Sequence, residues 1–457
     1  MRADLSRSRD ESRPGGWRLA AFASLAVPIY AAQMPLNVYL PTMLTQHYGL
    51  PLATIGLIFL IERLWGALAD PLIGIVSDRT DTQYGRRRTW ILAGGILFGL
   101  GTVGIFFPPL AISVPYLAVV LFVFYTGWAM MQIPHLAWSG EISHDYHERT
   151  RIQTHLQVAG AISLLLVLVL PTLLDQWRPN DIGAKQAAFG AFILLSLVVS
   201  LPLVLRSFPD QSTPDYRFAL PTTLQALQLV VREKLLVRII LSDFAVVFGQ
   251  LVRSTLFVFF VAIYMGLPHW ASGLFLLQYI FGIAAGPIWL AIGRKLGKHR
   301  TAITGELVQV AINLGLLLVT PQGFWLLIGL TVAQGLAQGS GNQMLRSMVA
   351  DIADKHRLET GIDQTALFFS AFSLSMKAAM AAAVGIALPL VGWLGFDPAG
   401  SNSADALHGL LFVFALGPAL AHAVSAALLL GFPLDEAAHS EIRARLDAGP
   451  GVLVPAE

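Results

Sequence analysis

Long apolar stretches alternate with short polar ones along most of the chain. Many of these stretches reach about 20 residues, which is the length that an α-helix needs to cross the apolar core of a bilayer. The pattern therefore predicts an all-α membrane protein with twelve transmembrane helices, at 18–45, 53–78, 89–108, 115–138, 152–174, 186–205, 237–264, 270–292, 301–320, 324–349, 363–392 and 405–432.

The composition agrees with this class. Hydrophobic residues make up 55% of the 457 residues and charged residues only 13%, which is too apolar for an ordinary soluble protein. The polar, basic head before Trp17 lacks the apolar core of a signal peptide. There is no cysteine, and no phosphate-binding loop, metal-ligand spacing or nucleophile elbow. We expect no enzymatic activity, no cofactor beyond a coupling ion, and no nucleic-acid partner.

Lysine and arginine are distributed unevenly between the two sides of the predicted membrane. With twelve spans both termini lie on one side, and that side carries 25 of the 30 basic residues. The other side carries only Arg178 and Lys185, while Arg63, Arg253 and Lys377 lie inside spans. Because basic loops stay in the cytoplasm, we expect a multi-pass protein of the inner membrane with both termini cytoplasmic. We also expect a monomer.

The longest polar interval lies near the middle of the chain, from Arg206 to Arg238. It contains three prolines and an amphipathic stretch at 224–236, which indicates a linker along the membrane surface. We therefore expect an N-terminal six-helix bundle at 1–205, a linker at 206–236 and a C-terminal six-helix bundle at 237–457.

The two halves resemble each other at two places. Glu141–Ser143 follows the fourth span as Asp351–Ala353 follows the tenth, at an offset of 210. Gly85–Arg88 follows the second span as Gly297–Arg300 follows the eighth, at an offset of 212. Two matches at nearly the same offset favour an ancient duplication, which is a common origin of transporters built from paired bundles.

Arg63 and Asp70 lie within the second span, seven residues apart and so on one helix face. A charged group at the bilayer centre costs roughly 2.5–3.5 kcal/mol on insertion scales, so chains usually keep such groups on an ion or substrate pathway. Asp70 would alternate between protonated and ionised forms, with Arg63 or Lys377 as counter-charge. The alternative is a permanent Asp70–Arg63 pair that only holds helices together.

These residues resemble the glycoside–pentoside–hexuronide:cation symporters of the major facilitator superfamily, the family of melibiose permease. The resemblance implies two pseudo-symmetric six-helix bundles and symport by alternating access. It rests on motifs that follow the family's order along the chain: Arg63–Trp65, Asp70–Gly74, Gly85–Arg88 with Trp90, Ile133–Pro134, Glu148–Thr150, Ala350–Asp354, Thr360–Gly361 and Lys377.

The second span departs from the pattern of sodium-coupled relatives. Where the resemblance implies a first aspartate, this chain has Gly66, while Asp70 remains. A sodium ion requires several hard oxygen ligands, whereas one carboxylate can still carry a proton. We therefore favour a proton over sodium as coupling ion, with sodium bound near Asp70 as the alternative.

The sugar-binding positions also differ. The resemblance places the family's acidic first-span residue at Tyr30, its fourth-span aspartate at Gln132 and its fifth-span arginine at Gln157. These side chains bind hydroxyls more weakly than an Asp–Arg pair does, so the solute is a different sugar or not a sugar. Lys377 and Arg253 join the candidate solute ligands because positive charge within spans suits an anionic solute.

The loop at 74–88 resembles the superfamily's signature loop after the second span. The resemblance implies that Asp78, Arg79, Arg86 and Arg87 form a conformational gate, whose salt bridges stabilise the outward-facing state. The simpler alternative is that the arginines only fix the orientation in the membrane.

Together these patterns predict a secondary active transporter. We expect it to move a glycoside, sugar or sugar acid together with a proton or sodium ion. One alternative is a carrier of a non-sugar organic anion or a lysolipid-like amphiphile. Another is a membrane sensor or assembly factor that does not transport, which the presence of Asp70 and Lys377 disfavours.

Overall fold

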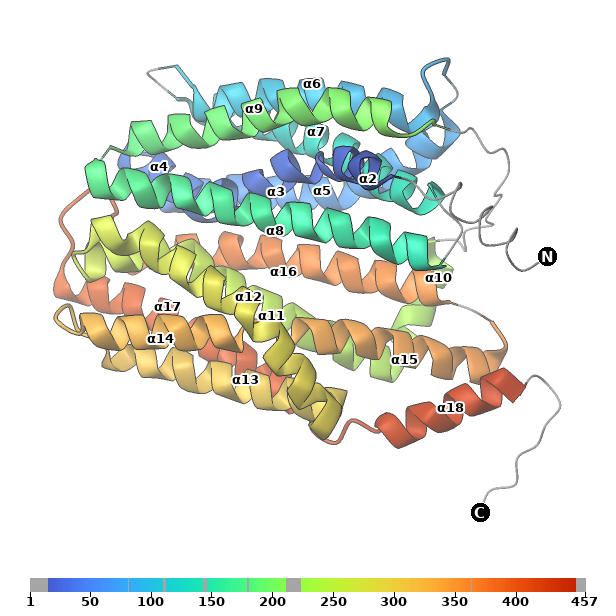
Figure 1. The fold of residues 1–457 in the computed structure, drawn as a ribbon. Helices are drawn as coiled ribbons and strands as arrows, with labels where there is room; N and C mark the ends of the chain where they lie inside the picture. Colours follow the sequence, from blue (N-terminus) through green and yellow to red (C-terminus); the bar gives the residue numbers. More distant parts are fainter. Residues whose placement is uncertain are drawn as a thin grey trace. The chain divides into compact units, whose positions relative to one another are not determined.

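Helices make up all the regular secondary structure in the described part of this computed structural model (Figure 1). Helices suit a bilayer because each one satisfies its own backbone N–H and C=O groups where water is absent. Eleven helices of the described part are long and apolar enough to cross a membrane. The structure describes residues 15–80, 82–109, 112–142, 146–178, 181–210, 223–362 and 364–448.

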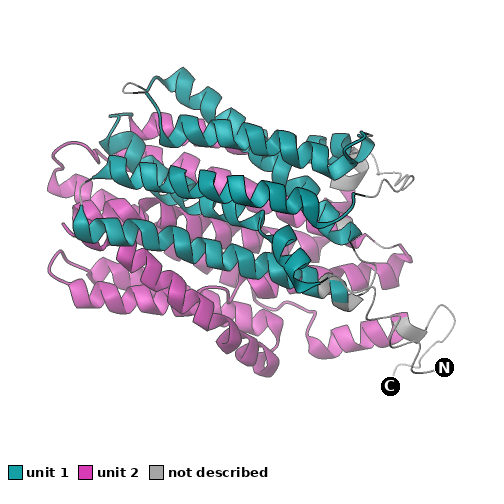
Figure 2. Ribbon diagram, turned by 45° about the horizontal axis from the view of Figure 1, so that its top comes forward, with its two compact units in different colours: residues 1–50, 64–216 teal, residues 51–63, 217–457 magenta. Residues whose placement is uncertain are grey.

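The chain divides into two compact units (Figure 2). Residues 1–50 and 64–216 form unit 1, and residues 51–63 and 217–457 form unit 2. The division near residue 216 falls within the predicted linker. Of the predicted head, linker and tail, residues 1–14, 211–222 and 449–457 lie outside the described residues.

Unit 1 contains the first six predicted spans, apart from the start of α5. The first span, 16–46, is not a uniform helix, because prolines remove backbone donors and a π-helical turn, η1, begins at Pro35. The elements are α2 (Gly16–Ala23), α3 (Ala26–Met34), η1 (Pro35–Tyr39), α4 (Leu40–Gln46), α5 (Leu52–Arg79), α6 (Arg86–Phe106), α7 (Val114–Glu141), α8 (Tyr146–Trp177) and α9 (Ile182–Ser207).

Unit 2 contains the other predicted spans and a short helix at each end. Its elements are α10 (Thr223–Arg232), α11 (Lys234–Phe259), η2 (Phe260–Tyr264), η3 (Pro268–Trp270), α12 (Ala271–Leu296), α13 (Lys298–Gly315), η4 (Leu316–Leu318), α14 (Phe324–Ala337), α15 (Asn342–Thr360), α16 (Thr365–Trp393), α17 (Ala404–Leu429) and α18 (Glu436–Ala448).

The start of α5 groups with unit 2 because it packs closely on α16. A Cβ atom on Gly56 would lie 2.8 Å from the ring of Pro389, and one on Gly385 would lie 3.2 Å from Leu60. These close approaches hold residues 51–63 against the second half of α16.

The predicted span at 324–349 needs a correction, because the chain breaks it into two helices. At 1.5 Å per residue, the 14 residues of α14 extend about 21 Å, which is shorter than the apolar core of a bilayer. Gln338 is extended and Gly339 has a φ of 83°, so the helix ends there and α15 begins at Asn342.

The predicted repeat is visible in the backbone. Gly85 and Gly297 both have positive φ, 100° and 78°, and each directly precedes a helix that begins with basic residues. A positive φ favours glycine, which explains why the same residue type stands at both places.

Candidate transport site

Asp70 lies in the part of α5 that packs on α7 within unit 1. Trp65 donates a hydrogen bond from Nε1 to Thr126 Oγ1 at 3.0 Å, and Ala69 belongs to a small buried cluster with Ala129. Asp70 directly follows Ala69, and Gln132 directly precedes Ile133, which packs against the same cluster. Both side chains are half-buried.

Tyr30 and Gln157 come together where α3 contacts α8. A Cβ atom on Gly160 would lie 3.0 Å from the ring of Tyr30, so the glycine lets the ring approach the helix backbone. Gln157 precedes Gly160 by one helical turn, and its side chain is exposed. Two of the three predicted sugar-binding positions are therefore neighbours.

Arg63 and Lys377 both belong to unit 2 and act on each other electrostatically. Arg63 Nε lies 3.5 Å from Glu62 Oε2, and Glu62 is buried. This pair offsets part of the positive charge that the two basic residues bring to the membrane segment.

Arg253 lies in the interior of unit 2. It is only 3% exposed, donates a hydrogen bond from Nη1 to Asn313 Oδ1 at 2.9 Å, and has its Cζ atom 5.6 Å from the ring centre of Phe414. The residue therefore belongs to the packing of α11, α13 and α17.

Two of the predicted gate residues of unit 1, Arg86 and Arg87, pair with the same acid. Arg87 lies 2.6 Å from Asp78 Oδ1 and 2.6 Å from Glu141 Oε1. Arg86 lies 2.9 Å from the same Glu141 oxygen. Arg79 is exposed in the last turn of α5. Glu141, at the end of α7, thus joins two of the predicted gate residues.

Unit 2 contains the matching pair. Lys298 Nζ lies 2.6 Å from Asp351 Oδ2, at the positions that the sequence repeat makes equivalent to Arg86 and Glu141. The C-terminal helix α18 adds to this cluster, because His439 Nε2 lies 3.3 Å from Asp351 Oδ1 and Arg443 Nη1 lies 3.2 Å from Asp354 Oδ1.

Comparison with known proteins identifies the family of the chain. The family model described as "MFS/sugar transport protein" matches residues 21–436, which is most of the chain. The chain belongs to this family.

Relatives of this sugar transport family member include the inner membrane symporter YicJ of Escherichia coli, 24% identical over 85% of this chain and 85% of that protein. The isoprimeverose transporter of Lactiplantibacillus pentosus is 25% identical over 88% of this chain and 85% of that protein. Among solved structures, the nucleoside transporter NupG has a TM-score of 0.64 at 12% identity, over 92% of this chain and 99% of that one.

Several predictions about this transporter are confirmed. It has the helical fold of the major facilitator superfamily, belongs with the sugar–cation symporters, is not an enzyme, and is a multi-pass inner-membrane protein that moves a small solute with a cation.

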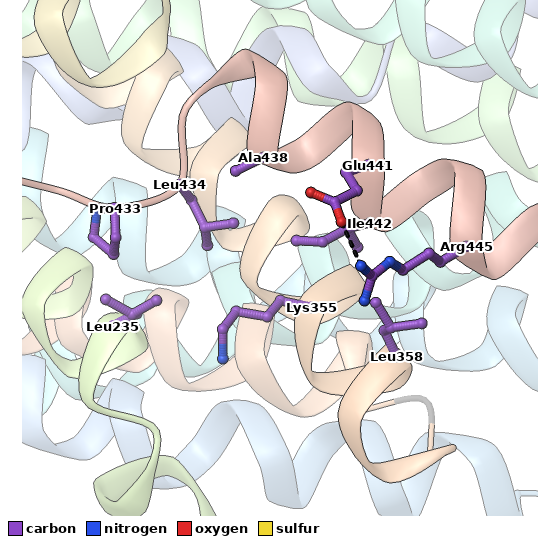
Figure 3. Close-up of a pocket in the computed structure, with 9 residues that line it drawn as sticks. All are labelled: Leu235, Lys355, Leu358, Pro433, Leu434, Ala438, Glu441, Ile442 and Arg445. Carbon is purple, nitrogen blue, oxygen red and sulfur yellow. Dashed lines mark hydrogen bonds and ion pairs between the residues drawn. The ribbon is translucent and has the colours of Figure 1, made fainter. Parts of the chain in front are cut away.

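Figure 3 shows a pocket of about 280 Å³ in unit 2 of this transporter. It lies beneath α18, against α15 and the start of α11, and contains none of the candidate residues. Its lining residues are Leu235, Lys355, Leu358, Pro433, Leu434, Ala438, Glu441, Ile442 and Arg445.

Sequence reasoning missed Asp210 as a site residue. Its Oδ2 atom accepts hydrogen bonds from the backbone N–H groups of Arg87, at 2.7 Å, and Arg88, at 3.0 Å. Asp210 therefore caps the start of α6 from more than 120 residues away. Helix caps are recognised in sequence by residues directly before the helix, so this partner left no local signal.

Proposed function

We propose that this protein is a proton-coupled symporter of a glycoside or sugar acid, with Asp70 as the residue that carries the coupling proton. The main support is the half-buried Asp70 within a spanning helix of a sugar-transport family member. With Gly66 in place of a second acid, one carboxylate suits a proton better than a sodium ion. Arg63, two turns away on the same helix, and Lys377 are the candidate counter-charges.

The solute would be bound mainly through its hydroxyl groups. Tyr30 packs on α8 one turn from Gln157, and Gln132 adjoins the α5–α7 cluster that Asp70 also adjoins. These neutral donors and acceptors suit sugar hydroxyls. Lys377 would bind a carboxylate of the solute, while Arg253, held by Asn313, would contribute its charge from the interior of unit 2.

The ion pairs of Asp78, Arg86 and Arg87 would form the gate in unit 1, with Arg79 adding positive charge at the same end of α5. Glu141 is the shared partner of Arg86 and Arg87, and the Lys298–Asp351 pair would serve the same purpose in unit 2. Since the basic residues gather at this end of the spans, we place the gate and both termini in the cytoplasm.

The thermal stability of the purified protein tests this proposal. The probes are glucuronic acid, a methyl glycoside and a lysophospholipid, each at two pH values and with or without sodium. A ligand at 100 times its dissociation constant stabilises the folded state by roughly 2.7 kcal/mol, which is measurable as a rise in melting temperature. We expect glucuronic acid or the glycoside to stabilise the protein without any requirement for sodium.

Two results would overturn parts of this proposal. Stabilisation only when sodium is present would replace the proton by sodium as coupling ion. Stabilisation by the lysophospholipid alone would make the protein an amphiphile carrier, and the sugar proposal would fail.

A further inference from the structure

In unit 2, α17 packs on both α11 and α13 (Figure 1). A seam of polar side chains runs along these contacts in the interior of the unit. Three cross-helix pairs follow one another along the seam. They are Ser242 with Ser425, whose Oγ atoms are 2.7 Å apart, Glu306 with His422, and Arg253 with Asn313. Burying ionisable groups in a membrane protein is costly, so those that are present usually have a function.

Glu306 and His422 form the centre of the seam. His422 Nδ1 lies 2.5 Å from Glu306 Oε2, and each residue is only 1% exposed. Hydrogen bonds between an imidazole and a carboxyl group are strongest when at least one partner is charged. An imidazole and a carboxyl group in this arrangement hold one proton between them, and neither is exposed to water that would solvate a separated charge.

Asp243 brings a second acid to the same interior. It is 1% exposed, and its Oδ2 atom has no hydrogen-bond partner among the described residues. The charged groups that act on it are Glu306 from α13 and Arg346 from α15. An ionised carboxylate is strongly disfavoured when it is buried with an oxygen left unbonded, so the geometry favours a bound proton on one of the two acids.

The other charged groups near this cluster are few. On α11, Arg238 lies five residues before Asp243 and donates hydrogen bonds to the carbonyl oxygen of Leu428. Arg253 lies ten residues beyond Asp243, nearly three turns away, and is bonded to Asn313. On α12 the charges are confined to Arg294 and Lys295 in the last turn, α14 has none, and α16 contributes Lys377. Among the described residues no lysine or arginine forms an ion pair with Asp243 or Glu306, so no bonded cation takes the place of the proton.

Glu306 also contacts the break between α14 and α15. A Cβ atom on Gly341 would collide with Glu306 Oε1, and one on Gly305 would collide with the side chain of Ser340. Glu306 therefore lies directly against the turn that separates the two half-helices. A change in the charge or position of Glu306 must therefore alter the conformation of that turn, because a closely packed interior has no free space to absorb the movement.

We propose that Glu306, His422 and Asp243 form a proton-binding site inside unit 2, distinct from Asp70, whose occupancy sets the conformation of the turn at 338–341. The proton comes from water, forms an O–H bond with a carboxyl oxygen of Glu306 or Asp243, and returns to water when that bond breaks. The site does not depend on Asp70 being the coupling residue, so either proposal can fail without the other.

Infrared difference spectroscopy of the full-length protein at successive pH values tests this site. The C=O stretch of a protonated carboxylic acid is separate from the bands of ionised carboxylates. Between about pH 6 and pH 9, exposed Asp and Glu stay ionised because their ordinary pKa values are near 4. We expect a protonated-acid band that changes with pH in Asp70→Asn, where the proposed coupling carboxylate is absent.

Variants then assign the band. We expect Glu306→Gln combined with Asp243→Asn to abolish it, and His422→Gln to shift its midpoint. Glu441→Gln, on the exposed face of α18, is the matched control and should leave it unchanged. A titrating band that survives in the double variant overturns the proposal. If the double variant does not fold, Asp70→Asn still decides, because the absence of any titrating acid band in that protein contradicts the site.

Discussion

Asp210 shows how one side chain joins distant parts of unit 1. Its carboxylate binds two N–H groups at the start of α6, and the backbone turns into that helix at Gly85 with a φ of 100°. A Cβ atom on Gly85 would collide with the Asp210 carboxylate. The glycine and the aspartate therefore depend on each other, and both lie beside Arg86 and Arg87.

Replacing Asp210 tests this cap. Asp210→Ala removes the acceptor, and loss of a helix cap costs about 1 kcal/mol, so we expect the melting temperature to fall by roughly 2–4 °C. Asp210→Asn keeps a side-chain oxygen and is the matched control, with most of the stability retained. Equal losses in the two variants would show that the charge, and not the cap, stabilises this end of α6.

The charged residues inside the spans show which parts of a site can be predicted from sequence. Arg63 and Asp70 were identifiable because each is a charge deep in an apolar run, a signal contained in one segment. Asp243 and Glu306 lie nearer the ends of their predicted spans, where a charged residue is less unusual. Both acids are buried in the structure. The partner of Glu306 is His422 of α17, which is 116 residues away in the sequence. No local pattern predicts such a partner.

At the scale of elements, the broken span is the main departure from a simple helical bundle. α14 ends at Ala337 and α15 begins at Asn342, although hydropathy predicts one continuous span. Hydropathy correctly predicts that α14 is apolar. It does not reveal the break, because glycine contributes little to the hydropathy of a segment. The break depends on the conformation of Gly339 and on the contact between Gly341 and Glu306.

A glycine substitution at the break tests its packing. In Gly341→Ala the new Cβ would overlap Glu306, and overpacking of this kind costs typically 1–3 kcal/mol, so we expect a lower melting temperature. Gly329→Ala in α14 is the control, since its Cβ would meet nothing within 4 Å and alanine favours the helix. Unchanged stability in Gly341→Ala would contradict the tight contact.

The salt bridges of Glu141 in unit 1 and of Asp351 in unit 2 can be tested by labelling. Glu141→Gln removes the acid shared by Arg86 and Arg87, and a partly exposed ion pair contributes up to about 1 kcal/mol, equivalent to a roughly fivefold change in an equilibrium. We expect a cysteine introduced at Ala137, one turn before Glu141, to react several-fold faster with a thiol reagent. The chain has no cysteine of its own, so the label reports on this site alone.

Asp351→Asn should act in the same way on a cysteine placed in unit 2. Lys355→Gln removes an ordinary pair on the surface of α15 and is the control, with no change in labelling. If the introduced cysteine reacts equally fast in the gate variants and in the protein whose salt bridges are intact, the salt bridges only stabilise the fold or fix its orientation.

At the scale of the whole molecule, the fold followed from the sequence more completely than the site did. Twelve apolar stretches and two repeated motifs predict two helical bundles, and the family model and the structure agree with that fold. The solute does not follow in the same way. Tyr30, Gln132 and Gln157 depart from the family's sugar-binding residues, so the resemblance supplies their positions but not what they bind.

The pH inside proteoliposomes, recorded as solute is added outside, is the most direct test of proton-coupled transport. With glucuronic acid or a methyl glycoside as probe, the protein should carry protons inward with the solute and acidify the lumen in the absence of sodium. Asp70→Asn should abolish this acidification, while Lys355→Gln should retain it. Solute uptake that proceeds only with sodium and leaves the internal pH unchanged would contradict proton coupling through Asp70.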